Sequence, residues 1–429
     1  MDSVKNPNRR KILLGTGALL AAGGLGWLKP RDFAEGGHNA YFQSLSDALN
    51  TAALGRPALV IDKASLLDNI NVLTQHLQNR FDYRIVAKSL PSIPLLKTVM
   101  EASGSKKLMV FHQPFLNAIA DQLPESDVLM GKPMPINAAA TFYGELKESD
   151  FNPDQQLQWL VDNPKRLQQY ADLSRRLNRP MNINIELDVG LHRGGVNRDA
   201  DLITMLNTIQ REPHLVLSGF MGYEPHIGKV PGDPLAQRDE AMSVYSHYLQ
   251  LAETHLGQSL KHLTLNGAGS PTYQYYNDGD VAQWPMNELS AGSCLAKPID
   301  FDLATLQDHV PAAYIATPVI KALDQTEIPG VSALGPIMSA WNPNLEKSFF
   351  TYGGYWKAQP ESPKGLTLNP VYGRSSNQEM LNGSSNVALQ QDDFVFLRPT
   401  QSESVFLQFG DIWVYENGAI TERWPIISA

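Results

Sequence analysis

The sequence predicts an α/β fold: a closed (β/α)8 TIM barrel of the alternating strand–helix type, followed by a mainly antiparallel β domain. From about residue 57 to residue 290, short apolar runs of strand length alternate with stretches of helical periodicity, which is typical of a parallel sheet covered by helices. Beyond about residue 302 the helical periodicity fades, and glycine, proline and short β-rich runs follow one another. An open doubly wound sheet is the alternative for the first region.

The number of strands favours the closed barrel. Strands that are apolar throughout are buried on both faces, as in a parallel sheet with helices outside it. Eight such runs are expected at 57–62, 83–88, 107–111, 127–130, 156–161, 181–189, 215–223 and 262–266, and a ninth at 286–290. Helices are expected at 41–53, 64–78, 95–102, 115–122, 164–177, 200–210 and 235–255.

The chain beyond residue 302 is expected to form a second domain rich in β-strands. Its strands are expected at 314–317, 348–352, 394–397 and 411–415. An Asn-Gly pair predicts a hairpin turn at 416–419. The expected domain boundaries are 39–301 for the barrel and 302–429 for the β domain, with residues 1–38 set apart from both.

Composition and charge exclude several classes of protein. With 43% hydrophobic and 18% charged residues over 429 positions, the chain is globular and long enough for two domains. A net charge of −9 argues against nucleic acid as a partner. Cys294 is the only cysteine, so neither an intrachain disulfide nor a zinc site of several thiolates can form.

The first 38 residues have the layout of an export signal. Lys5, Arg9, Arg10 and Lys11 precede an uncharged, apolar and glycine-rich run from residue 12 to residue 28. The Arg9-Arg10 pair resembles a twin-arginine (Tat) signal, which predicts the Tat export machinery as a partner and a periplasmic location. The alternative is a membrane anchor that is retained, because the run is close to the shortest length that spans a bilayer.

Lys88 is the first candidate for a catalytic residue, because it ends a strand-like run. A lysine at the carboxyl end of a barrel strand lies at the mouth of the barrel, where the active sites of this fold are found. A primary amine in that position can condense with an aldehyde to form an imine. A solvated lysine at a strand end is the alternative interpretation of this run taken alone.

The segment 182–196 combines two carboxylates, an arginine and a cluster of glycines. Glu186 and Asp188 share one face of a strand by its two-residue period, and carboxylates that point into a barrel need cationic partners. Arg193, just past the strand, is such a partner. The glycines between 190 and 195 allow a sharp turn close to a ligand. An ion-paired loop without a ligand is the alternative.

Two glycine-serine turns follow later strands. Residues 266–273 read Asn-Gly-Ala-Gly-Ser-Pro-Thr-Tyr, and residues 291–293 read Ala-Gly-Ser. Glycines beside a hydroxyl residue can wrap backbone N–H groups around an anion. Because neither turn matches a P-loop or a dinucleotide fingerprint, the anion expected is a simple phosphate. An ordinary loop is the alternative for either turn alone.

In this order, the pieces resemble the D-threonine aldolase and D-serine dehydratase-like family. They are Lys88, Asp-Val-Gly-x-x-Arg-x-Gly-Val at 188–196, Gly-Ala-Gly-Ser-Pro-Thr-Tyr at 267–273 and Glu-Leu-x-Ala-Gly-Ser at 288–293. The resemblance covers residues 55–425. It implies a pyridoxal 5'-phosphate enzyme of the alanine racemase type (fold type III) that acts on a small amino-acid substrate and forms a homodimer.

The resemblance also implies roles for single residues. Lys88 would form the internal Schiff base, and Arg193 would lie beside the cofactor ring with Asp188 steadying that region. Tyr223 matches the pocket tyrosine of the family, and His226 is a further candidate on the same loop. The residues that would hold the phosphate are Gly267, Gly269, Ser270, Gly292 and Ser293.

The C-terminal part departs from the family pattern at its metal ligands. Where the family has Pro-x-His-x-Cys or Pro-x-His-x-Asp, this chain has Pro-Thr-Gln-Ser-Glu at 399–403. Gln401 replaces the imidazole, and Glu403 replaces the thiolate or carboxylate. A carboxamide is a poor ligand for zinc, so no metal is expected; an oxygen-rich Mg²⁺ or Mn²⁺ site at Glu403 is the alternative.

The function implied is that of a pyridoxal-phosphate-dependent lyase acting at Cα or Cβ of a small, D-configured amino acid. It would be an aldolase like D-threonine aldolase or an ammonia-lyase like D-serine dehydratase. The expected catalytic residues are Lys88, Arg193, Tyr223, Gln401 and Glu403. The alternatives are an amino-acid racemase of the same fold, a cofactor-binding protein without turnover, and a sugar-binding barrel, which leaves Lys88 unexplained.

Overall fold

The computed structural model describes residues 29–78, 80–277, 283–327, 330, 334–369 and 371–428. The expected signal at 1–28 lies outside the described residues. The described chain forms two compact units. One consists of Ala58–Tyr314 and Arg398–Ala429, and the other of the residues up to Pro57 together with Ile315–Leu397.

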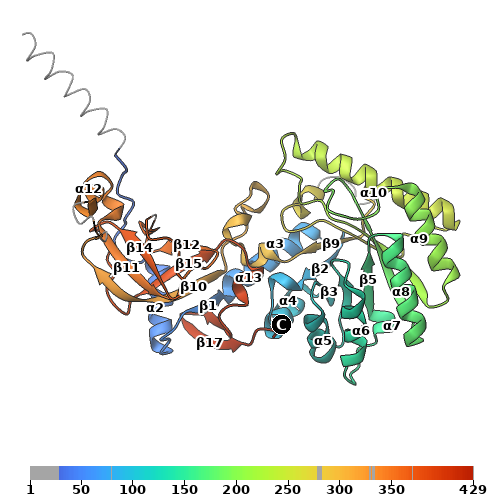
Figure 1. Ribbon diagram of the computed structural model, residues 1–429, viewed down its shortest axis with the longest axis horizontal. Coiled ribbons are helices and arrows are strands. Elements are labelled where there is room, and N and C mark those ends of the chain that lie inside the picture. The colour runs from blue at the N-terminus through green and yellow to red at the C-terminus, as the bar shows by residue number, and fades with distance from the viewer. Residues whose placement is uncertain are drawn as a thin grey trace, which may run out of the picture. The chain divides into compact units, whose positions relative to one another are not determined.

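Eight parallel strands close into a barrel in the larger unit (Figure 1), which confirms the predicted fold class. The strands pair in chain order, and the last returns to the first through the pairs Asp82↔Glu288 and Ile85↔Ala291. They are β2 (Asp82–Val86), β3 (Lys107–Val110), β4 (Asp127–Met130), β5 (Leu157–Val161), β6 (Met181–Leu187), β7 (Leu215–Gly222), β8 (Thr264–Gly267) and β9 (Glu288–Ala291).

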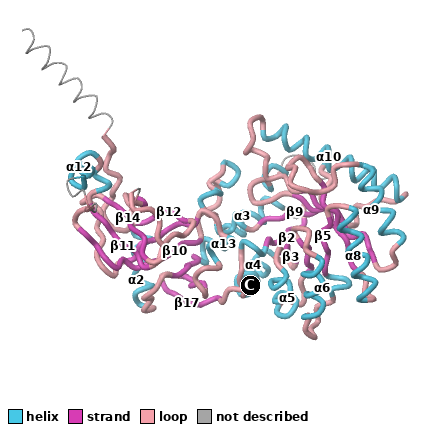
Figure 2. The backbone as a smooth tube through the Cα atoms, in the orientation of Figure 1, coloured by secondary structure: helices cyan, strands magenta, loops and turns pink. Residues whose placement is uncertain are grey.

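Helices lie outside the barrel strands (Figure 2). Asn163 begins one of them by accepting a hydrogen bond from the Arg166 N–H, and Gly257 ends another in the left-handed conformation. The helices of this unit are α3 (Lys63–Leu77), α4 (Ile93–Ser103), α5 (Gln113–Gln122), α6 (Ile136–Glu145), α7 (Pro153–Gln156), α8 (Pro164–Leu177), α9 (Asp199–Arg211), α10 (Pro234–Leu256) and the short α11 (Ser293–Ala296) and α13 (Glu403–Phe406). The sequence analysis did not predict α6 or α7.

The first strand predicted for the barrel lies elsewhere. The run that begins this unit forms β1 (Ala58–Asp62), which pairs in parallel with β16 (Ile412–Glu416) and not with a barrel strand. The ninth predicted strand, observed as β9, closes the barrel in its place. The prediction was wrong here because β1 is buried along its whole length, so its composition matches that of a barrel strand.

A buried ion pair lies inside the barrel, below the barrel mouth. Arg84 from β2 and Glu288 from β9 are both fully buried, and two hydrogen bonds of 2.5 and 2.9 Å join them. Lys107 lies 3.0 Å from the second Glu288 oxygen. Although burial favours the neutral acid, Arg84 and Lys107 hold the pKa of Glu288 below its ordinary value. Arg84 therefore has a structural role in β2, the strand that leads to Lys88.

The smaller unit is built mainly from antiparallel strands. Strand β11 lies between β10 and β14, and β15 pairs with β10 on its other side. The rings of Phe42 and Phe396 pack 5.1 Å apart, so the helix that carries Phe42 covers this sheet. Its elements are α2 (Ala40–Thr51), β10 (Ala313–Leu323), α12 (Leu334–Trp341), β11 (Lys347–Tyr352), β12 (Ala358–Ser362), β13 (Thr367–Leu368), β14 (Gln378–Gly383) and β15 (Phe394–Pro399).

The division into units differs from the boundaries expected at residues 38 and 301. The helix predicted at 41–53 groups with the antiparallel strands, while the chain from Arg398 onward groups with the barrel. Pairing of β1 with β16 joins segments about 350 residues apart, which local patterns do not reveal. The hairpin turn at 416–419 is confirmed, since β16 pairs with β17 (Ala419–Trp424) across it. Of the helices described, none combines the length and hydropathy that a membrane span requires.

Candidate active site

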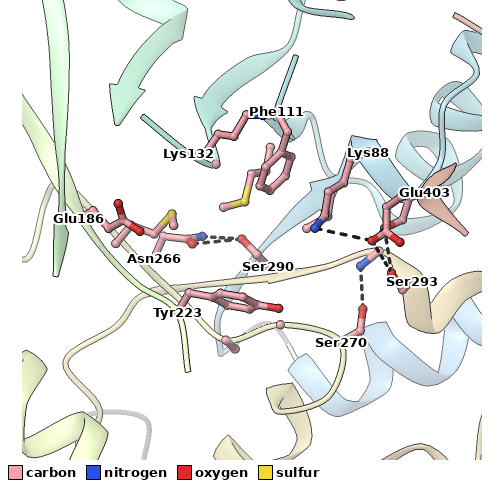
Figure 3. Close-up of a pocket in the computed structure, with 18 of the residues that line it drawn as sticks. Lys88, Phe111, Lys132, Glu186, Tyr223, Asn266, Ser270, Ser290, Ser293 and Glu403 are labelled. Atoms are coloured by element: carbon pink, nitrogen blue, oxygen red, sulfur yellow. Dashed lines mark hydrogen bonds and ion pairs between the residues drawn. The ribbon is translucent and has the colours of Figure 1, made fainter. Parts of the chain in front are cut away.

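A cavity of about 250 Å³ opens at the carboxyl ends of the barrel strands (Figure 3). Pockets for small ligands usually begin near this size, so the cavity suits a compact cofactor or metabolite. Lys88, Arg193, Tyr223, Ser270 and Glu403 all line it. The structure thus brings together residues that the sequence analysis selected from five separate segments.

Lys88 lies in a single 3-10 turn, Ala87–Ser89, directly after strand β2. Its Nζ is 3.6 Å from Glu403 Oε1 and 4.7 Å from the centroid of the Phe111 ring. The lysine side chain is 41% exposed and that of Glu403 32%, so both groups are half-buried at the cavity wall. This is the only ion pair that the described structure gives Lys88.

Two hydroxyls join the same cluster. Ser89 Oγ lies 2.8 Å from Ser293 Oγ, and both hydroxyls lie within hydrogen-bond distance of Glu403 Oε1, at 3.2 and 3.5 Å. One carboxylate oxygen therefore meets an ammonium and two hydroxyls. We refer to Lys88, Ser89, Ser293 and Glu403 as the lysine corner.

Ser270 joins the two glycine-serine turns. Its Oγ accepts hydrogen bonds from the Gly292 N–H at 3.0 Å and the Cys294 N–H at 3.1 Å. A hydroxyl has two lone pairs and one proton, so these bonds use its lone pairs and leave its proton to donate. Because Ser270 lines the cavity, this proton is available to an anion there.

The glycines of the two turns are required for close packing. A Cβ at Gly269 would lie 2.7 Å from the Tyr223 ring, and a Cβ at Gly292 would lie 2.6 Å from the Val86 carbonyl oxygen. Both glycines line the cavity. Gly267 does not, because it packs against Met286, whose sulfur would be 1.8 Å from a Cβ. The structure therefore places Gly267 away from the group that it was expected to hold.

Residues 268–272, which we call the 268–272 loop, are held from behind by Glu224. This fully buried carboxyl accepts from the Ala268 N–H at 3.2 Å and from Thr272 Oγ1 at 2.8 Å. Burial raises the pKa of Glu224 to about 7, against the effect of these hydrogen bonds. The Gly269 N–H in turn donates to Thr272 Oγ1, so this amide is used within the loop. Gly269 therefore contributes to the turn because it has no side chain, and not through its N–H group.

Tyr223, Arg193 and Glu186 form the wall away from the lysine corner. The Arg193 guanidinium carbon lies 5.6 Å from the centroid of the Tyr223 ring, close enough for a cation–π contact. Burial, together with the charge of Glu224, raises the pKa of Tyr223 to about 12, so its hydroxyl keeps its proton at neutral pH. Burial, with the neighbouring Asp162 carboxylate, raises the pKa of Glu186 to about 7, although Arg193 opposes this.

Asp188 is one step removed from the cavity. It accepts hydrogen bonds from the Gly190 N–H at 3.2 Å, the His192 N–H at 2.8 Å and the His192 ring at 3.0 Å. Burial favours the neutral acid, but these bonds outweigh it and hold the pKa of Asp188 below its ordinary value. Asp188 therefore stabilises the turn that positions Arg193 in the cavity. His226 packs against Gly190 and likewise does not line the cavity.

Gln401 is not brought together with the other candidates. Its side chain is exposed and does not line the cavity, whereas Glu403 does. The two residues belong to one short segment, yet only Glu403 begins the helix α13 that faces Ser89. Within the described ranges, no group of three or more His, Cys, Asp or Glu side chains is arranged to hold a metal ion.

Several cavity residues were missed by the sequence analysis. Phe111, Lys132 and Asp162 line the cavity and follow β3, β4 and β5 within two residues. Their signal was available, because side chains just past the carboxyl end of a barrel strand lie at its mouth. Asn266 and Ser290, hydrogen-bonded to each other at 2.8 Å, line the cavity from strands β8 and β9.

The closed parallel barrel, with a strand-end lysine facing glycine-serine turns, defines a barrel of the alanine racemase type. The family described as alanine racemase, N-terminal domain, matches residues 61–296, more than half of the chain. The protein therefore belongs to this family. No curated protein matches the chain by sequence.

Solved structures share this fold at low sequence identity. D-threonine aldolase from Filomicrobium marinum superposes with a TM-score of 0.68 at 15% identity, covering 87% of this chain and 97% of the aldolase. D-threo-3-hydroxyaspartate dehydratase from Delftia sp. HT23 gives 0.66 at 14% identity, covering 88% of this chain and 98% of the other. Alanine racemase from Bacillus anthracis gives 0.63 at 15% identity, with 87% and 98% covered.

Proposed function

We propose that the protein is a pyridoxal 5'-phosphate-dependent lyase that acts at Cα and Cβ of a small, D-configured β-hydroxy amino acid. The observation that carries the proposal is the pair formed by Lys88 and Glu403, whose charged atoms are 3.6 Å apart in a cavity at the barrel mouth. Membership of the alanine racemase N-terminal domain family and the likeness to an aldolase and a dehydratase support it.

The cavity residues fit pyridoxal phosphate. Lys88 supplies the amine for its aldehyde, while the Ser270 proton and the Ser293 hydroxyl suit its phosphate. Gly269 and Gly292 line the cavity and let the two turns pack closely against Tyr223 and Val86, which shapes the cavity wall. When bound, the cofactor supplies an electron sink for the electron pair left on Cα.

The lysine corner offers two groups that can move protons side by side. Dehydration of a β-hydroxy amino acid removes the Cα proton and requires a proton on the departing hydroxyl. Aldol cleavage removes the hydroxyl proton and returns one to Cα. Either reaction needs a base and an acid close together, which Lys88 Nζ and Glu403 Oε1 provide.

Ser89 and Ser293 would orient the Glu403 carboxylate. Both hydroxyls lie within hydrogen-bond distance of Oε1, the oxygen that also faces Lys88. Arg193 and Tyr223 form the other wall and would fix the position of the ring. We assign Gln401 no part in the reaction because of its exposed position outside the cavity.

The adjacent pair of Lys88 and Glu403 favours a lyase, and a racemase is the second candidate. Racemisation at Cα needs proton-transfer groups on opposite faces of the substrate. Tyr223 and Glu186 line the wall across from Lys88, and burial raises the pKa of Glu186 to about 7, so groups that can exchange protons lie on both walls.

The test is incubation of the purified protein, with pyridoxal phosphate, with D-threonine, D-serine and D-alanine, with and without a chelator. Glycine from D-threonine identifies an aldolase, and ammonia with a keto acid from D-serine identifies a dehydratase. Loss of optical purity of D-alanine without either product would replace the lyase proposal with a racemase. Cofactor binding without turnover of any D- or L-amino acid would leave a cofactor-binding protein.

We propose that the chain is exported by the twin-arginine route with its apolar run, residues 12–28, kept as a membrane anchor. The Arg9-Arg10 pair and the uncharged run that follows support this proposal. We also propose a homodimer, on the family resemblance. Membrane fractionation of cells that express the full chain, and the mass of the detergent-solubilised protein, test the two points.

A further inference from the structure

Helix α12 (Leu334–Trp341) of the smaller unit turns an apolar face to solvent. It contains no charged residue, and among residues 335–341, whose side chains the structure describes, the exposed ones are Pro336, Ile337, Ala340 and Trp341, which share one side of the helix. Ile337 is 61% exposed and Trp341 43%. Large apolar side chains of a surface helix normally face the core, so this arrangement needs a partner.

Close packing on the other side of this helix leaves its apolar face outward. A Cβ at Gly335 would lie 2.1 Å from the Thr326 carbonyl oxygen, so glycine lets the helix rest directly on that backbone. The Asn342 N–H donates to the Met338 carbonyl at 2.7 Å and continues the helix into the 3-10 turn Pro343–Leu345. Gly335 therefore faces the backbone of its own unit, while Ile337 and Trp341 are exposed.

The N-terminal segment is attached at the end of this helix. Buried Asn344 donates to the Arg31 carbonyl at 2.7 Å and accepts from the Phe33 N–H at 3.0 Å. Figure 1 shows the start of the described chain beside α12. Phe33 is 61% exposed, which places a third large apolar side chain at the same end of the unit.

We propose that Phe33, Ile337 and Trp341 form a docking surface for a lipid bilayer, into which they insert when the apolar run 12–28 is anchored. We call these three residues the apolar patch. Arg31 is three positions beyond the end of the run, and three extended residues span at most about 11 Å. Because Asn344 fixes Arg31 to the turn after α12, an anchored run holds this helix at the membrane surface.

The composition of the patch suits the interface region of a bilayer. Tryptophan and phenylalanine are favoured at the boundary of headgroups and acyl chains, and an isoleucine adds apolar area beside them. Lys29 and Arg31 are exposed at the start of the described chain and can meet lipid phosphates. The occupant proposed is therefore a bilayer containing anionic lipid. The inference rests on the retained anchor and not on the proposed chemistry.

The test places an environment-sensitive fluorophore at position 337 of the full chain. Cys294 is buried, so a cysteine introduced by Ile337→Cys is the one that reacts with the label. The labelled protein is reconstituted into vesicles of phosphatidylethanolamine and phosphatidylglycerol, some with brominated acyl chains. We expect a blue shift and quenching by the brominated lipid. The matched control is Leu235→Cys on helix α10, which is 45% exposed, and its label should not respond.

Flotation of the vesicles separates the two parts of the inference. If the chain floats but the label at 337 does not respond, the docking surface is refuted while the anchor stands. If the chain does not float, the anchor and the docking surface fail together. If the label shifts without lipid and the shift grows with protein concentration, a second copy of the chain covers the face. If the shift without lipid does not depend on protein concentration, another part of the same chain covers it. Both results overturn the proposal. Turnover in detergent should be unchanged by Ile337→Cys in every case.

Discussion

The lysine corner and the 268–272 loop stand at two sides of one cavity and are built in opposite ways. Glu224, which holds the loop, is fully buried, and each of its carboxyl oxygens accepts a hydrogen bond from a loop residue. In the corner, Glu403 is half-exposed, and one oxygen faces an ammonium and two hydroxyls. The loop fixes a shape, whereas the corner keeps ionisable groups within reach of a ligand.

The difference shows what identical side chains can do in two environments. The buried carboxyl of Glu224 has a pKa raised to about 7 and serves the fold. The half-buried carboxyl of Glu403 has a cation as partner and lines the cavity. Substitutions in the loop should therefore change stability and its pH dependence first, and substitutions in the corner should change turnover first.

The largest effect is expected from Lys88→Ala. Removing the only amine in the corner should lower turnover at least about a thousandfold and abolish the absorbance band of bound pyridoxal phosphate. Lys132→Ala is the matched control, because Lys132 lines the same cavity from another strand end. The band should persist in that variant. If Lys88→Ala kept the band while Lys132→Ala lost it, the assignment of the amine would move to Lys132.

Glu403→Gln should lower turnover by about 10²- to 10⁴-fold, because the amide cannot exchange a proton. Its stability should change by no more than about 1 kcal/mol, since the ion pair is half-exposed. Chemical denaturation and steady-state kinetics of the same preparation check both values. Ser404→Ala, at the exposed neighbouring position, is the control. An equal loss in that variant would point to a disturbed helix α13.

Glu224 should make the protein less stable as the pH rises from about 4.5 to 7. Its pKa is near 7 in the folded protein, against an ordinary value of 4.5 for an exposed glutamate, so the folded protein holds this proton more tightly. Stability is fully present below pH 4.5 and is lost as the pH rises through 7, by about 3 kcal/mol. Denaturation at pH 5 and pH 8 measures the change.

Glu224→Gln is the matched variant, because an amide can keep the hydrogen bonds of the neutral acid. Its stability should depend less on pH than that of the wild type. Burial also raises the pKa of Glu186, which lines the cavity, to about 7, so Glu186→Gln separates the share of Glu186 in the dependence of stability on pH. If the stability of both variants depends on pH as strongly as that of the wild type, neither carboxyl is responsible for this dependence.

Ser270→Ala should cost about 1–3 kcal/mol of stability, because the buried Gly292 and Cys294 N–H groups lose their acceptor. It should also weaken pyridoxal phosphate binding, measured by titration of the absorbance band. Thr305, which does not line the cavity, donates a hydrogen bond to the Pro271 carbonyl of the same loop, and Thr305→Ala removes this bond. That control should lose little cofactor affinity.

The smallest effect is expected from Gln401→Ala. The side chain is exposed and does not line the cavity, so turnover should change less than about twofold and stability by less than about 0.5 kcal/mol. A large loss of turnover with normal cofactor binding would restore the catalytic role that the sequence analysis gave this residue.

Much of the fold was predictable because its signals are local. The alternation of apolar runs with stretches of helical periodicity predicted the parallel barrel. A residue at the carboxyl end of a barrel strand is expected to place its side chain at the mouth of the barrel. Lys88 was found in this way, and Phe111, Lys132 and Asp162 carry the same signal. The roles of these residues in catalysis stay predictions.

By itself, the sequence determined the class of the fold, the lysine at the end of β2 and the two glycine-serine turns, because each depends on residues close together in the chain. Only the tertiary structure decided that β9 and not β1 closes the barrel, and that Glu403 rather than Gln401 faces Lys88. Pairing over some 300 residues depends on burial and hydrogen bonding summed over both partners. The sequence of one partner segment therefore does not show which other segment it will pair with.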